Sequence, residues 1–197
     1  MLNNNNKFSK ILELLFDSNV HLGHGVSCWN PKMAQYLLAN YDKLHIIDLE
    51  RTIPLIKRAI SVLDHVYQGG SNILIVGNTK DNHMFTADVV KRERVYGVTG
   101  KWIGGSLTNW DPKHFSYTAA NLEPPKLIIL LNTNNNSTAI KEAREKMIPI
   151  IAILDSDSDP KGITYPIPGN DDSIRSYAFF CSLISQAIQE GKQKIGA

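Results

Sequence analysis

The chain has 197 residues, of which 43% are hydrophobic and 20% are charged, and its net charge is +2. This length supports one substantial domain, and the composition is typical of a soluble globular protein. The low net charge excludes an overwhelmingly basic protein, so binding to nucleic acid would depend on local clusters of Lys and Arg. The two cysteines, Cys28 and Cys181, are far apart in sequence, which argues against a disulfide framework and fits a reducing compartment.

The N-terminal residues carry no signal for transport. Residues 1–7 lack the apolar core of a secretory signal and the arginines of an organelle presequence, so we expect the protein to work where it is made. The asparagine-rich residues 1–6 are expected to form a flexible end. No apolar run approaches the ~20 residues that a membrane span needs, so no membrane contact is expected.

Apolar residues at helical spacing predict a helix over residues 8–16. A glycine-bearing loop is predicted at 21–25, and a turn or helix start at Asn30–Pro31, because proline favours the first helical position. Two short extended segments are predicted within 36–48. A longer amphipathic helix follows over 49–67, for which Thr52 is the predicted cap.

From residue 49 onward, helical patterns alternate with continuous apolar runs. Further helices are predicted over 79–92 and 137–147 and in a closing segment, and strands over 72–77, 96–99, 127–131, 149–154 and 164–167. Strands without polar alternation are buried on both faces, as in parallel sheets. The pattern predicts one α/β domain over 1–197, with three layers, a mostly parallel sheet and helices on both faces.

The last two predicted helices have specific expected faces. In the helix over 137–147, Glu142 and Lys146 are expected to pair on the exposed side. The closing helix is expected to use Asn170 as its cap, with Asp171 and Asp172 in its first turn. Its predicted buried stripe consists of Ile174, Tyr177, Cys181, Ile184 and Ile188.

Ligands of open α/β sheets gather at the carboxyl ends of the strands. Three polar segments follow predicted strands, at 77–80, 132–136 and 155–160. The first lacks the spacing of a phosphate loop, and a helix-entry turn with an exposed Lys80 is the competing interpretation. The Asp-rich third segment has Pro160 where a calcium loop needs glycine, which leaves open a magnesium contact or a role in turns and caps.

His21 and His24 are candidates for metal ligands, with a third ligand from Cys28, Asp48 or elsewhere in the chain. Hydrogen bonding within a glycine-rich loop, or contact with phosphate, is the alternative role that we favour. No combination of nucleophile, base and acid stands out in the sequence. We therefore predict no metal site and no cofactor, and nothing in the residues argues for an enzyme, although catalytic residues that meet only in space stay an open alternative.

Segment 102–110 has two adjacent glycines between aromatic residues. It follows a run of basic residues, which are Lys91, Arg92, Arg94 and Lys101. Tryptophans suit either core corners or stacking, so two interpretations arise. One is a glycine turn anchored by two buried tryptophans, and the other is a platform for a polyanion.

Six segments together resemble the S-two family of small-subunit ribosomal proteins, in its bacterial and organellar branch. These segments are 20–24, 29–33, 46–52, 102–110, 155–160 and 167–172. The resemblance implies a flavodoxin-like fold without chemistry, docked on the small ribosomal subunit. It also implies ribosomal RNA and neighbouring ribosomal proteins as partners, and no homo-oligomer.

The chain departs from the family between residues 111 and 126. The bacterial relatives carry a long helical hairpin there, and this connection is too short to form one. A reduced protein of this kind suits an organelle ribosome. The expected lack of a presequence and the asparagine runs favour a mitochondrial location, with the plastid or the bacterial cytoplasm as alternatives.

We expect the protein to bind folded RNA mainly through phosphates, because proteins recognise RNA helices by shape and backbone. The candidate RNA-binding residues are His21, His24, Trp29, Asn30, Lys32, Lys80, Lys91, Arg92, Arg94, Lys101, Trp102 and Asn109. One competing function is an enzyme or sensor for a phosphorylated small molecule, bound at the strand ends near Gly77, Asn132 and Asp155. Another is a protein-interaction scaffold that uses the last helix.

Overall fold

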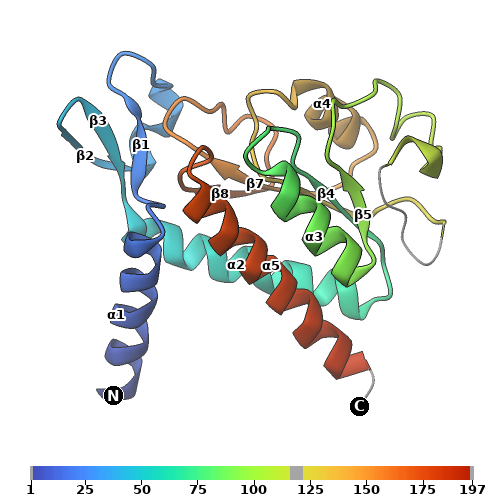
Figure 1. Cartoon of the computed structure of the whole chain (residues 1–197), viewed down its shortest axis with the longest axis horizontal. Coiled ribbons are helices and arrows are strands. Elements are labelled where there is room, and N and C mark those ends of the chain that lie inside the picture. The colour runs from blue at the N-terminus through green and yellow to red at the C-terminus, as the bar shows by residue number, and fades with distance from the viewer. Residues whose placement is uncertain (1, 116–121, 196–197) are drawn as a thin grey trace.

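The computed structural model describes residues 2–115 and 122–195, and its centre is a parallel sheet (Figure 1). Its strands are β4 (Ile73–Val76), β5 (Tyr96–Val98), β6 (Leu127–Leu130), β7 (Ile150–Leu154) and β8 (Tyr165–Pro168). They lie in the order β5-β4-β6-β7-β8, and all neighbouring pairs are parallel. This is the strand order of flavodoxin-like folds. The predicted α/β architecture is confirmed.

Helices cover both faces of this sheet. They are α2 (Leu49–Gln68), α3 (His83–Glu93), α4 (Ser137–Glu145) and α5 (Ile174–Ile195). Successive strand residues point to opposite faces, so Ile73 and Ile75 join the core formed with α2, α3 and α5, whereas Leu74 and Val76 join the core on the α4 side. Because both faces are covered, β4, β6 and β7 are fully buried, which explains their continuous apolar sequences.

The segment after β5 completes the face of the sheet on which α4 lies. Trp102, Leu107 and Phe115 from this segment pack in the same core as the buried residues of α4. The segment also contains a short 3-10 helix, η2 (Pro112–His114). Residues 116–121 of the connection to β6 lie outside the described residues.

The N-terminal region adds a helix and a small antiparallel sheet beside β8 (Figure 1). Its elements are α1 (Leu2–Asp17), β1 (Leu22–Gly25), the 3-10 helix η1 (Pro31–Tyr36), β2 (Leu37–Tyr41) and β3 (Leu44–Ile47). The loop prediction for 21–25 is wrong, because pairing with β3 makes this glycine-rich segment a strand. The first helix begins earlier than the predicted residue 8, and the flexibility of residues 1–6 stays a prediction.

The predicted cap of α2 is also wrong. Asp48 occupies the cap position, and its side chain accepts hydrogen bonds from the backbone N–H groups of Glu50 and Arg51. Thr52 lies inside the first turn, where its hydroxyl donates to the carbonyl oxygens of Asp48 and Pro168, at 3.1 and 2.9 Å. Thr52 therefore joins α2 to the end of β8.

Two later helices start after their predicted first residues. α3 begins at His83 because Thr79 and Asn82 form a polar turn, in which Asn82 Oδ1 accepts a hydrogen bond from the Thr79 N–H at 3.0 Å. Asn170 does not cap α5 directly. Its side chain accepts hydrogen bonds from the N–H groups of two residues that precede the helix, both at 2.9 Å. Ile174 is 59% exposed and lies outside the buried stripe, whose other predicted members are buried.

An apolar groove of about 660 Å³ lies between α1, α2 and α5. Its apolar lining includes Ile11, Leu14, Ile60, Phe179 and Leu183. α5 therefore presents apolar side chains both to the core and to this groove. Within the described ranges, no helix combines the length and the apolar character that crossing a bilayer requires.

Candidate functional site

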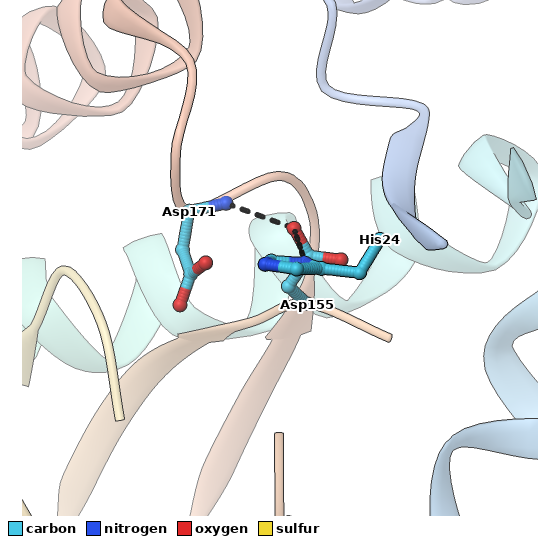
Figure 2. A group of neighbouring side chains, drawn as sticks. All are labelled: His24, Asp155 and Asp171. Atoms are coloured by element: carbon cyan, nitrogen blue, oxygen red, sulfur yellow. Dashed lines mark hydrogen bonds and ion pairs between the residues drawn. The ribbon is translucent and has the colours of Figure 1, made fainter. Parts of the chain in front are cut away.

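Three segments that are distant in sequence meet beside the carboxyl ends of β7 and β8 (Figure 2). His24 lies on β1, Asp155 directly follows β7, and Asp171 comes three residues after the end of β8. Because β7 and β8 are parallel neighbours, their carboxyl ends lie at the same edge of the sheet. A histidine from the small sheet thus joins two carboxylates from the large one.

Backbone contacts hold β1 and its following loop against the loop after β7. The His24 N–H donates a hydrogen bond to Ser156 Oγ, and the Asn30 N–H donates one to the Ser156 carbonyl oxygen, both at 2.8 Å. Gly23 is needed for this approach, because a Cβ there would lie 3.0 Å from Ser156 Oγ and 3.1 Å from the His45 carbonyl oxygen. Segments singled out separately in the sequence therefore form one packed unit.

Two titratable groups in this cluster, His24 and Asp171, bind protons more tightly than the same groups would in water. His24 Nδ1 lies 3.2 Å from Asp155 Oδ2, and His24 Nε2 lies 3.0 Å from Asp172 Oδ2. Contact with the Asp155 carboxylate, aided by two further aspartates and opposed by burial, raises the pKa of His24 to about 9. Burial, together with neighbouring carboxylates, raises the pKa of Asp171 to about 8.

The same three side chains could hold a divalent cation. His24, Asp155 and Asp171 each offer a ligand atom, and these atoms lie within 4.8 Å of one another. One imidazole nitrogen and two carboxylate oxygens suit such an ion. Cys28 and Asp48, two possible third ligands in the sequence, do not join His24, because Cys28 is exposed and Asp48 caps α2. The signal that could have identified the actual partners is their position after two consecutive predicted strands, β7 and β8.

Five of the predicted RNA-binding residues gather around β1 and η1. They are His21, His24, Trp29, Asn30 and Lys32. The ring of His21 stacks on Phe16 at 4.2 Å, and Asn30 caps η1. Lys32 Nζ lies 2.8 Å from the carboxylate of Asp159, so its charge is shared within the chain. Trp29 is 40% exposed, and its ring centroid lies 5.3 Å from that of His45.

The other predicted basic residues lie near β4 and β5. Three exposed side chains form what we call the α3 basic cluster, which consists of Lys91, Arg92 and Arg94. Arg92 pairs with Asp88 one turn earlier in α3. Lys101 is exposed but follows β5, whereas the cluster precedes it, so the strand separates the two. Lys80 is exposed in the turn after β4.

The glycine-containing loop 102–109 is organised by a residue for which helical spacing predicts a surface position. Glu142 of α4 is only 7% exposed. Its Oε1 accepts hydrogen bonds from Trp102 Nε1 at 3.1 Å and from the Gly105 N–H at 2.8 Å, and its Oε2 accepts one from the Leu107 N–H at 3.0 Å. The predicted exposed pair of Glu142 with Lys146 is therefore wrong, because the carboxylate turns inward to these donors.

This loop divides the predicted RNA-binding residues between core and surface. Trp102 is 7% exposed and packs in the core, so its ring has no accessible face for stacking on a base. Gly105 has a φ of +91°, a conformation that favours glycine. Ile103, Gly104 and Asn109 remain exposed. The tryptophan thus anchors the loop, and its neighbours form the surface.

A covered parallel sheet with this strand order defines a three-layer α/β protein of the flavodoxin-like type. The family model described as Ribosomal protein S2 matches residues 15–123 and 112–191 of the chain. The chain belongs to the ribosomal protein S2 family.

Similar proteins include the small ribosomal subunit protein uS2 of Gluconacetobacter diazotrophicus, which is 34% identical over 90% of this chain and 83% of its own length. The uS2 protein of Rhodospirillum rubrum is 34% identical, over 93% of this chain and 85% of its own length. The uS2 protein of Ehrlichia canis is 36% identical, over 89% of this chain and 74% of its own length. The first alignment spans 215 positions, more than the 197 residues of this chain, so the relative has residues without a counterpart here.

Proposed function

We propose that the chain is a structural constituent of the small ribosomal subunit that binds ribosomal RNA and neighbouring ribosomal proteins, without catalysis. The observation that carries this proposal is the similarity along about 90% of the chain to proteins named small ribosomal subunit protein uS2. The exposed α3 basic cluster supports the RNA contact, since Lys and Arg neutralise phosphates. Within the described parts of the chain, no carboxylate forms an ion pair with Lys91 or Arg94.

The strand ends support a protein without a small-molecule cofactor. In flavodoxin-like folds the ligand crevice opens where the strand order reverses, which here lies between β4 and β6. At this place Asn78 Nδ2 donates to Asn136 Oδ1 at 2.9 Å, and Asn136 Nδ2 donates to the Asn132 carbonyl oxygen at 2.9 Å. These amides connect the loops after the two strands, which favours the ribosomal function over the enzyme or sensor.

The apolar groove between α1, α2 and α5 supports contact with a neighbouring ribosomal protein. Leu14 on its rim is 50% exposed, although an isolated protein of this size tends to keep large apolar surfaces covered. We therefore propose that the last helix contributes to contacts within the ribosome, in place of the separate interaction scaffold.

We further propose that the ribosome concerned is mitochondrial. The short connection over 111–126 and the asparagine runs support this location. The test is sedimentation of a mitochondrial lysate, in which we expect the chain to migrate with the small subunit and to be released by ribonuclease. Recovery with small subunits of another compartment, or sedimentation that ribonuclease leaves unchanged, would contradict the proposal.

Replacing the α3 basic cluster tests the RNA contact. In the triple variant Lys91→Gln, Arg92→Gln, Arg94→Gln, the slope of log affinity against log salt for small-subunit RNA should flatten by about 2 to 3, because each phosphate contact contributes roughly 0.7 to 0.9. The matched control is Lys57→Gln, Lys113→Gln, Lys126→Gln, which removes the same charge from other exposed positions. Equal slopes for the two variants would reject the assignment.

A further inference from the structure

A second cavity lies at the start of α4, near the carboxyl ends of β6 and β7. It has a volume of about 370 Å³ and is bounded by the loop after β6, by α4 and by residues 159–161. We call it the α4 pocket. Its polar lining includes Thr133, Ser137, Lys141, Arg144 and Lys161. The predicted RNA-binding residues include none of these.

The first feature of the pocket is an uncapped helix start. Asn136 occupies the cap position of α4, but its side chain makes no capping hydrogen bond there. Its amide instead donates to Asn132 and pairs with Asn78. The first turn of a helix has N–H groups without acceptors inside the helix, and their summed dipoles attract anions. Ser137, which begins α4, lines the pocket.

The second feature is a buried hydroxyl group without a partner. Thr133 is 5% exposed, and its Oγ1 has no hydrogen-bond partner among the described residues. Buried hydroxyl groups are rarely left in this state, because losing water without gaining a partner is unfavourable. Thr133 lines the pocket that α4 begins in, so an acceptor bound there would supply the missing partner.

The third feature is an excess of positive charge around the opening. Lys141, Arg144 and Lys161 are exposed and line the pocket. The one carboxylate that lines it, that of Asp159, accepts hydrogen bonds from Lys32 Nζ at 2.8 and 2.9 Å and from the Lys161 N–H at 2.9 Å. The Asp159 carboxylate is therefore already paired with Lys32. The basic side chains that line the pocket remain available to bind an anion.

We propose that the α4 pocket binds a phosphate of the RNA backbone. The phosphate oxygens would accept hydrogen bonds from the first turn of α4 and from the Thr133 hydroxyl, and Lys141 and Arg144 would supply charge. The exposed position of both cations suits a phosphate in a long chain, which meets the protein at its surface. This inference rests on the proposed ribosomal function and adds to it a second RNA contact, separate from the α3 basic cluster.

The test uses the full chain and small-subunit RNA. The double variant Lys141→Gln, Arg144→Gln should flatten the slope of log affinity against log salt by about 1.5, relative to the control Lys57→Gln, Lys113→Gln, which removes the same charge. Thr133→Val keeps the side-chain shape but removes the hydroxyl, so we expect about tenfold weaker binding with an unchanged slope. Thermal melting checks that both variants fold like the wild type.

Amide NMR signals identify the ligand of the pocket. We expect RNA to shift the signals of residues 137–139, and Thr133→Val to reduce that shift. A shift with inorganic phosphate but none with RNA would show a site for free anions and overturn the inference. If the double variant binds RNA like its control while the triple variant of the α3 basic cluster has a flatter slope of log affinity against log salt, the pocket inference fails and the proposed function stands. If the wild-type chain fails to bind small-subunit RNA, the proposed function itself fails.

Discussion

Replacing Glu142 by Ala should lower the free energy of unfolding by about 3 to 5 kcal/mol. The carboxylate accepts hydrogen bonds from one indole N–H and two backbone N–H groups, and all three donors belong to the loop 102–109. Although burial opposes ionisation, the hydrogen bonds from Leu107, Gly105 and Trp102 keep the pKa of Glu142 below its usual value. Alanine would leave these donors without the acceptor around which the loop is arranged.

Glu142→Gln separates the charge from the size of the side chain. Glutamine has one acceptor oxygen, and its NH₂ group would face an N–H donor at either Leu107 or Gly105. We expect a loss of about 2 to 3 kcal/mol in urea unfolding, with faster hydrogen exchange at these two amides. The control is Glu145→Gln, which removes the same charge from an exposed position of α4. Equal stability of the two glutamine variants would show that the buried carboxylate does not hold the loop.

The same variant connects the loop to the proposed function. Glu142→Gln removes no charge from the surface, yet it should weaken RNA binding if the exposed residues Ile103, Gly104 and Asn109 contact RNA. A loss of affinity with an unchanged salt slope would indicate that the shape of the loop matters. Full RNA affinity in a folded variant with a disordered loop would place the RNA contact elsewhere on the protein.

The sheet could be predicted from the sequence because its strands are buried on both faces. A run such as Leu127–Leu130 has no polar residue to expose, so composition alone indicates a covered strand. The sequence also indicated most helix positions through the spacing of apolar residues. Strand β1 escaped prediction because Leu22–Gly25 is short and rich in glycine, and its extended form depends on pairing with β3, which lies about twenty residues later.

Helix starts could not be predicted to the residue because several neighbouring side chains can serve as caps. Asp48 lies just before α2 and Thr52 lies in its first turn, so both are possible caps. Only the structure shows that Asp48 accepts hydrogen bonds from the free N–H groups at the helix start. Asn170 belongs to a polar turn for the same reason. The local sequence indicates that a capping residue is present, whereas the tertiary structure determines which side chain caps the helix.

The candidate sites depend on contacts between distant segments, which sequence spacing does not encode. His24 meets Asp155 and Asp171 only because β1 lies against the loop after β7. The spacing of Glu142 and Lys146 predicts a pair on the exposed face of α4, but a stronger set of donors lies on the inner side. In both cases a charged residue is buried where several polar partners converge, and the identity of those partners follows from the tertiary structure.

The chain should lose stability as the pH rises from 6.5 to 9 in buffer that contains a chelator. The pKa of His24 is raised from 6.5 to about 9, so its contribution is fully present below pH 6.5 and disappears as the pH rises through 9. The pKa of Asp171 is raised from 3.8 to about 8, so its contribution declines from pH 3.8 up to about pH 8 and overlaps with that of His24 between pH 6.5 and 8. Both groups bind protons more tightly in the folded state, and their effects therefore have the same sign.

We expect the free energy of unfolding to fall by about 2 kcal/mol over this interval, after allowance for the partial exposure of His24. Urea unfolding at a series of pH values measures the change. Asp171→Asn keeps the size of the side chain and removes its ionisation, so the decline should become shallower, and His24→Gln should reduce it further. A cation at the cluster would compete with these protons, so adding Zn²⁺ should offset the loss near pH 8 in the wild type but not in Asp171→Asn. A stability profile that is flat from pH 6.5 to 9 in the wild type would mean that the cluster does not control the pH response. The same conclusion would follow if the profile were as steep in both variants as in the wild type.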